Sequence, residues 1–174
     1  MLTRRWRKML LAVAALIAAS IAFAGWYRFH FSMSAARPFE VNGPHSSPRV
    51  LIATQGSEFK DVVVAGVVEH LKAHSAYVKV IDVSALPGVD EGEWNAIVLM
   101  HTWEMRKPPQ EVKAFVDRAR SPAKWVVLTT SGAGTFKLDG VDAISSASIV
   151  AEAPSRADDI LVKLEAILGR ESAK

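Results

Sequence analysis

The chain contains no cysteine among its 174 residues. Disulfide bonds, thiolate metal sites and cysteine nucleophiles are therefore excluded. No serine–histidine–acid order, paired-carboxylate motif or metal-ligand spacing stands out either, so the residue pattern identifies no catalytic group. Half of the chain is hydrophobic, which is enough for one domain with a sizeable core and an appendage.

Acidic residues are absent from the first 37 positions. Six of the 21 basic residues lie there, so the other 15 face all 18 acids, and residues 38–174 carry a net charge of −3. The overall charge of +3 therefore comes from the N-terminus alone. This distribution argues against a nucleic-acid partner and indicates a membrane-targeting region.

Residues 9–27 are uncharged and rich in Ala, Leu, Ile and Val, and they are long enough for a transmembrane anchor. Residues 1–8 carry four bases, so we expect them to be cytoplasmic and the rest of the chain to lie on the other side of the membrane. A cleaved signal peptide is the alternative, with Ala22-Phe23-Ala24 as its cleavage site. We favour the anchor because the apolar run continues past that site.

Residues 28–48 show no clear periodicity and are rich in Ser, Pro, Asn and Gly, which is typical of a flexible tether. Residues 49–170 form the predicted domain, and residues 171–174 form a short tail. Within the domain, strands are predicted at 50–54, 77–83, 94–101 and 124–130, with a weaker one at 141–150. Helices are predicted after the first and third strands and from Ser155 to Gly169.

This alternation predicts a doubly wound α/β domain with a mainly parallel sheet of four to five strands. Only ten residues separate the predicted fourth and fifth strands, which is short for a parallel crossover. The fifth strand is therefore expected to be irregular, or paired antiparallel through the turn Asp139-Gly140.

The segment Thr54–Lys60 joins the first strand to the first helix of this domain through a glycine-containing turn. At such junctions, free backbone N–H groups and the positive helix end bind anions. Thr54, Ser57 and Lys60 add two hydroxyls and a positive charge that could help to hold an anionic ligand, and the sequence leaves open whether one is bound here.

The order of elements resembles the flavodoxin-like superfamily, which includes flavodoxins, flavin-dependent quinone reductases and flavodoxin-type protoporphyrinogen oxidases. The resemblance is carried by the strand and loop Trp94–Trp103, by the helix Pro109–Arg118 and by the small turn Thr130–Gly134. It implies FMN at the carboxyl ends of the first, third and fourth strands. The implied FMN-binding residues are Thr54, Gln55, Gly56, Ser57, Glu58, Phe59, Lys60, Thr102, Trp103, Ser131, Gly132 and Gly134.

The phosphate loop departs from the family pattern, in which three hydroxyl side chains surround the FMN phosphate. Aligned on Gly56, those positions hold Ala53, Gln55 and Glu58, and the Glu58 carboxylate would repel a phosphate. Two hypotheses follow. In the first, a membrane-anchored FMN protein exchanges electrons with a membrane redox partner or quinone; in the second, a cofactor-free domain of the same fold acts as a binding or scaffold module.

Overall fold

The computed structural model describes residues 4–31, 33–118, 120–138 and 140–172. The chain forms two compact units, residues 1–32 and residues 33–174. The first unit contains the helix α1 (Arg4–Phe31), which includes the predicted span. Its segment Arg4–Trp26 is long and apolar enough to cross a membrane by length and composition, a property that signal sequences share.

The second unit is built around a seven-stranded sheet, as counted over the described residues. Its strands are β1 (Ser34–Ala35), β2 (Phe39–Val41), β3 (Arg49–Gly56), β4 (Tyr77–Asp82), β5 (Ala96–Thr102), β6 (Trp125–Thr130) and β7 (Ala143–Ser146). Its α-helices are α2 (Glu58–Ala73), α3 (Gln110–Asp117) and α4 (Ala153–Ser172). Short 3₁₀ helices are η1 (Val83–Gly88), η2 (Glu91–Glu93), η3 (Pro122–Lys124) and η4 (Val150–Glu152).

The strands from β3 to β7 are parallel and lie in the order β4-β3-β5-β6-β7. This is the spatial order second, first, third, fourth, fifth that flavodoxin-like sheets have. Two antiparallel strands are added: β1 pairs with the end of β3, and β2 pairs with the outer edge of β4. The prediction of a mainly parallel sheet of four to five strands is therefore corrected to a mixed sheet of seven.

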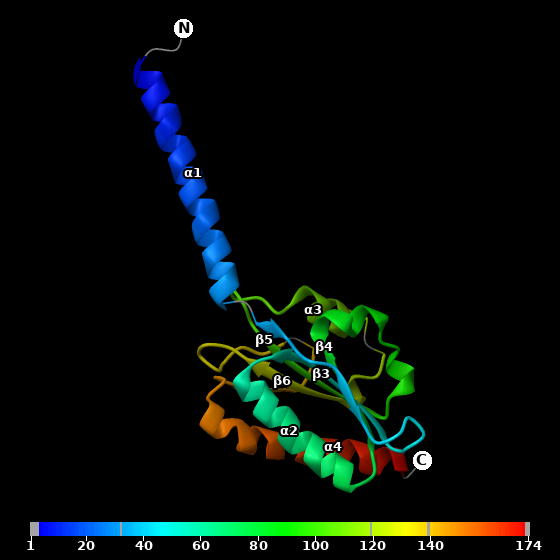
Figure 1. Ribbon diagram of the computed structural model, residues 1–174. Coiled ribbons are helices and arrows are strands. Elements are labelled where there is room, and N and C mark those ends of the chain that lie inside the picture. Colours follow the sequence, from blue (N-terminus) through cyan, green and yellow to red (C-terminus); the bar gives the residue numbers. More distant parts are fainter. Residues whose placement is uncertain (1–3, 32, 119, 139, 173–174) are drawn as a thin grey trace. The chain divides into compact units, whose positions relative to one another are not determined.

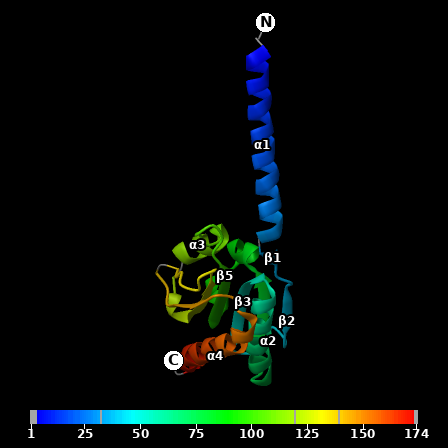
Figure 2. The ribbon, with the colours of Figure 1, turned by 90° about the vertical axis from the view of Figure 1, so that its left-hand side faces the viewer.

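Alternate residues of each central strand face opposite layers, as the pleat requires. In β3, Val50 and Ile52 pack in the core beneath α2 and α4, whereas Leu51 and Ala53 pack in the core beneath α3 and η1. Figures 1 and 2 show α2 and α4 together on one face of the sheet and α3 on the other. The sheet is therefore buried on both sides, which explains the nearly continuous apolar run of its strands.

The predicted tether between residues 28 and 48 is wrong where β1 and β2 join the sheet. These strands are two and three residues long, so neither is long enough to show a period-two pattern. Their pairing partners lie far away in the sequence, so local composition carries no signal for them.

The antiparallel alternative for the fifth strand is also wrong, because β7 pairs with β6 in parallel. Residues 131–142 connect the two strands, with no helix at the described positions of this connection, and its length is just sufficient for a crossover. Gly140 has a positive φ of 80°, while Asp139 of the predicted turn lies outside the described residues. The last helix begins at Ala153 and continues through Gly169 to Ser172.

Candidate functional site at the carboxyl edge

The carboxyl ends of β3, β5, β6 and β7 meet at one edge of the sheet. The connections from β3 and β5 leave to opposite faces, which makes this edge the topological switch point where open α/β sheets bind ligands. Most of the predicted site residues lie here, at Thr54–Lys60, Thr102–Trp103 and Ser131–Gly134. This edge is therefore the candidate site.

The predicted loop after the first strand consists of Ser57 alone. β3 continues as a strand through Gly56, and α2 begins at Glu58. Ser57 caps α2, because its side-chain oxygen accepts a hydrogen bond from the backbone N–H of Lys60 at 3.3 Å. The Glu58 side chain is exposed, whereas Phe59 is buried in the core under α2 and cannot contact a ligand.

A short segment that follows α1 in the chain covers this strand end. We call Met33–Ala36 the strap. Within it, Ser34 and Ala35 form β1 and pair with Gly56 and Gln55. The fit at Gly56 is close, because a Cβ added there would lie 2.6 Å from Ser34 Oγ and 2.9 Å from the Ala35 carbonyl oxygen.

Besides its backbone pairing with β3, the strap donates three further hydrogen bonds to different parts of the edge. Ser34 Oγ donates to the Gly56 carbonyl at 2.9 Å. The N–H of Met33 donates to Glu104 Oε1 at 3.1 Å, and the N–H of Ala36 donates to Asp82 Oδ2 at 2.7 Å. The strap thus connects the ends of β3 and β4 and the loop after β5.

Lys60 lies beneath the strap, and its exposed fraction is 0%. Its Nζ donates to Thr102 Oγ1 at 2.6 Å and lies 3.7 Å from Met33 Sδ. Burial lowers the pKa of Lys60 from 10.5 to about 8, although Asp61 and Glu104 favour the charged form. Lys60 was predicted to supply positive charge to a phosphate, but its ammonium group is directed to a threonine of β5 instead.

A chain of hydrogen bonds continues from Lys60 across the strand ends. Thr102 Oγ1 and Thr130 Oγ1 are 2.7 Å apart, and Thr130 Oγ1 donates to the His101 carbonyl at 3.3 Å. Gln55 Oε1 accepts the backbone N–H of Thr102 at 2.7 Å. Gln55 and Lys60, both predicted to bind a ligand, are thus used to join β3 and α2 to β5.

His101 is fully buried next to this chain of bonds. Its Nε2 lies 3.1 Å from Thr129 Oγ1, while Nδ1 has no hydrogen-bond partner among the described residues. Desolvation, assisted by the charge of Lys60, lowers the pKa of His101 from 6.5 to about 4. The imidazole is therefore neutral at pH 7 and behaves as part of the core.

Trp103 follows β5 directly, but one of its faces is occupied. Its ring stacks on Phe136 with 4.9 Å between centroids, and the Arg106 guanidinium lies 6.0 Å from the Phe136 centroid. The buried Trp103 Nε1 has no hydrogen-bond partner in the described part of the chain. Beside this stack lies a cavity of about 150 Å³, which also contacts Pro108 and Leu138.

The turn after β6 packs against the loop after β7. The N–H of Ser131 donates to the Ser146 carbonyl at 3.1 Å, and the N–H of Gly134 donates to the Ser131 carbonyl at the same distance. Gly134 has a φ of 67°, and an added Cβ would lie 2.9 Å from the Ala147 nitrogen, so this position requires glycine. The buried hydroxyls of Ser131 and Ser146 have no partner among the described residues, and Gly132 is exposed.

The residues at this edge do not fit FMN in the conformation described. The backbone that would surround the phosphate is paired with the strap at Gly56, and Glu58 places a carboxylate in the first turn of α2. Trp103 and Phe136 are in direct contact, which leaves no space for an isoalloxazine ring between them. Sequence reasoning missed the strap, because nothing in Met33–Ala36 indicates pairing with residues about twenty positions later.

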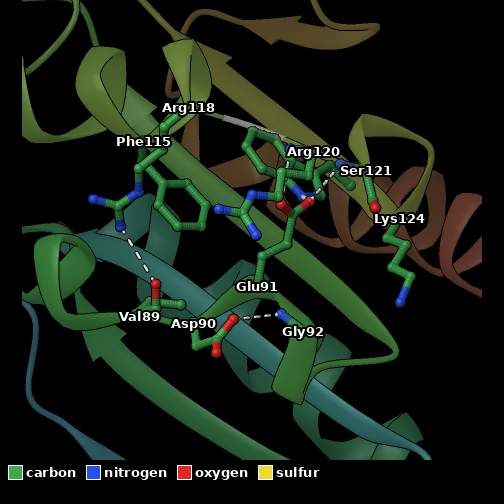
Figure 3. A pocket seen from close by; sticks show the side chains of 10 residues that line it. Val89, Asp90, Glu91, Gly92, Phe115, Arg118, Arg120, Ser121 and Lys124 are labelled. Atoms are coloured by element: carbon green, nitrogen blue, oxygen red, sulfur yellow. Dashed lines mark hydrogen bonds between the residues drawn. The ribbon is translucent and has the colours of Figure 1, made fainter.

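A second cavity, of about 410 Å³, lies at the opposite edge, near the amino ends of β5 and β6 (Figure 3). Glu91 is central to it: its carboxylate accepts the N–H groups of Arg120 and Ser121 at 3.0 Å and Trp125 Nε1 at 2.9 Å. The Lys124 side chain points away from Arg118 and Arg120 in Figure 3. The polar groups of this cavity join chain segments and do not converge on a ligand.

No protein-family model and no curated protein matches the chain. Among solved structures, an oxidoreductase from Corynebacterium diphtheriae is 11% identical with a TM-score of 0.42, covering 70% of this chain and 97% of its own. Oxidised Flavodoxin 2 from Bacillus cereus is 14% identical with a TM-score of 0.41, covering 67% of this chain and 99% of its own. Similarity at this level says nothing about what this chain binds.

Proposed function

We propose that the chain is a membrane-anchored, flavodoxin-like binding module that holds no flavin. The observation that carries this proposal is the strap paired with Gly56, which occupies the backbone that a flavin phosphate would need. The polar side chains of the edge support it, because Lys60 and Gln55 are already bonded to Thr102. The domain then functions through its surface rather than through a redox group.

The membrane part of the proposal rests on α1 and on the charges at its ends. A lipid bilayer is crossed by about twenty apolar residues, and Arg4–Trp26 meets that requirement. Basic residues tend to be retained on the cytoplasmic side, and this tendency supports a cytoplasmic N-terminus with the domain on the other side of the membrane. The partner is accordingly another component at the membrane.

FMN-dependent electron transfer to a membrane partner or a quinone is the second candidate. It is favoured by three buried polar groups at the edge that lack a partner among the described residues: Trp103 Nε1, Ser131 Oγ and Ser146 Oγ. Such groups are uncommon in native proteins, and a bound ligand would satisfy them. In that case the flavin supplies the redox chemistry, and the protein supplies binding and orientation.

Absorbance and fluorescence separate the two candidates. The full chain, purified in detergent, is expected to be colourless and to leave the fluorescence of added FMN unquenched. Riboflavin, which lacks the phosphate, is the matched ligand control. An isoalloxazine absorbance band in the purified protein, or saturable quenching of FMN, would overturn the cofactor-free proposal in favour of the redox protein.

A further inference from the structure

We infer that the loop Glu104–Lys107 is a second point of contact between the chain and the membrane. In this contact Met105 enters the lipid surface, and Arg106 and Lys107 bind acidic headgroups. We call these four residues the tip loop. The inference rests on the membrane anchor of the proposed function and deepens it, because it names a lipid surface as a partner of the α/β domain.

The tip loop is a two-residue hairpin turn whose central side chains are exposed. Glu104 and Lys107 exchange both of their backbone hydrogen bonds, each at 3.0 Å. Met105 and Arg106 between them have φ values of 46° and 62°, the left-handed conformation that a type I′ turn requires. Such a turn favours Asn-Gly, so the backbone gives no reason for methionine and arginine at these positions. A contact made by their side chains does give one.

The Met105 side chain supplies the apolar part of the contact. It is 76% exposed, more than any other large hydrophobic side chain that the structure describes. Methionine is flexible and apolar, so it adapts to an irregular surface such as that of a lipid bilayer. Single exposed apolar residues are common on proteins, and the assignment to lipid therefore depends on the charges beside Met105 and on the attachment of the loop.

The charges beside Met105 are both positive. Arg106 and Lys107 are exposed, and neither forms an ion pair with a residue that the structure describes. The Arg106 guanidinium lies 6.0 Å from the Phe136 centroid, a contact that leaves its charge without a counter-ion. Residues 38–174 carry a net charge of −3, so the tip loop opposes the charge of the rest of the domain. An apolar side chain next to bases is the arrangement that binds a surface of acidic lipids.

The tip loop is bonded to the point where the chain enters the domain. The Glu104 carboxylate accepts the N–H of Met33 at 3.1 Å. Met33 follows Trp26, the last residue of the candidate span, by seven positions, and seven residues reach at most about 25 Å when fully extended. With α1 in a bilayer, Met33 is thus within this reach of the end of the span in any orientation of the domain. The contact is intramolecular with respect to the anchor, so weak binding by the loop is sufficient.

Nitroxide labels on the full chain test this contact, and each label is unique because the chain has no cysteine. Met105→Cys carries the label at the tip loop. Val162→Cys carries it at a control position on α4, where the native side chain is 68% exposed. Each labelled chain is inserted, one per disc, into lipid nanodiscs of phosphatidylcholine alone or mixed with phosphatidylglycerol. One chain per disc excludes contact with a second copy. Electron paramagnetic resonance then measures the accessibility of the label to a water-soluble nickel complex.

Two pairs of substitutions in the Met105→Cys chain test the role of charge. Arg106→Gln with Lys107→Gln removes the bases of the tip loop. Lys72→Gln with Arg170→Gln is the matched control, because it removes two exposed bases from α2 and α4. We expect phosphatidylglycerol to lower the nickel accessibility of the tip label about threefold relative to the α4 label. The control pair should keep this protection, and the tip pair should lose it.

Each alternative outcome overturns a different statement. A tip label as accessible as the α4 label, in a chain that co-elutes with the discs, overturns the inference while the proposed function stands. Protection that needs neither phosphatidylglycerol nor the two bases overturns the binding of acidic headgroups. A chain that does not co-elute with the discs overturns the membrane anchor of the proposed function instead.

Discussion

The ammonium group of Lys60 is buried with one hydroxyl oxygen and one thioether sulfur as its neighbours. A charge in this environment destabilises the fold unless a counter-ion is present. The sequence places Lys60 correctly at the start of α2, near the predicted ligand. It cannot reveal the direction of the side chain, because the Thr102 hydroxyl that it reaches lies 42 positions later.

Lys60→Met should stabilise the domain at pH 7 by roughly 2 kcal/mol. The pKa of Lys60 is about 8 in the folded state and 10.5 in the unfolded state, so burying the charged form costs about 3 kcal/mol below pH 8. Methionine removes this cost, but the lost hydrogen bond to Thr102 takes back about 1 kcal/mol of the stabilisation. Between pH 8 and 10.5 the unfolded state binds more protons, so the wild-type protein gains stability as pH rises, and the advantage of the variant fades.

Urea unfolding at pH 7 and pH 10 measures this difference. Lys72→Met is the control, because Lys72 is an exposed lysine on the same helix. A Lys60→Met protein that is less stable than wild type at pH 7 would show that the ammonium group contributes more through its hydrogen bond than its burial costs.

At the scale of elements, the sequence predicts the four strands β3, β4, β5 and β6 and the helices between them, because each carries its own periodicity, whereas it predicts a weak fifth strand without its parallel direction. β3, β4, β5 and β6 agree with the predicted strands to within two residues at each end. β1 and β2 were missed because their stability comes from backbone pairing to β3 and β4, which local sequence does not encode. The candidate site depends on the same pairing, so its closure was not predictable either.

Glu91 of η2 joins three parts of the fold. Its carboxylate accepts hydrogen bonds from two backbone N–H groups of the α3–β6 connection and from the Trp125 indole of β6. Glu91→Ala is expected to lower the free energy of unfolding by about 2–3 kcal/mol, because three donors lose a charged acceptor. Glu93→Ala, which removes an exposed carboxylate 3.9 Å from Arg49, should cost less than about 0.5 kcal/mol. Chemical denaturation of both variants gives the comparison, and equal losses would refute the linking role of Glu91.

At the scale of the whole molecule, the chain combines a membrane-type helix with an α/β domain, and α1 is compatible with either an anchor or a signal peptide. The anchor predicts that the mature protein has the mass of the full chain and remains in the membrane fraction after washing at high pH. Intact-mass measurement after fractionation checks both. A mass that corresponds to cleavage after Ala24 would establish the signal peptide.

β1 is the first strand of the sheet in chain order, and it follows α1 with few residues between them. If α1 is held in a bilayer, any force along the backbone reaches this two-residue strand before it reaches the rest of the sheet. β1 would then separate at low tension while the parallel strands stay intact. Tension on the attachment would then uncover the backbone of Gln55 and Gly56, the two residues of β3 that pair with β1.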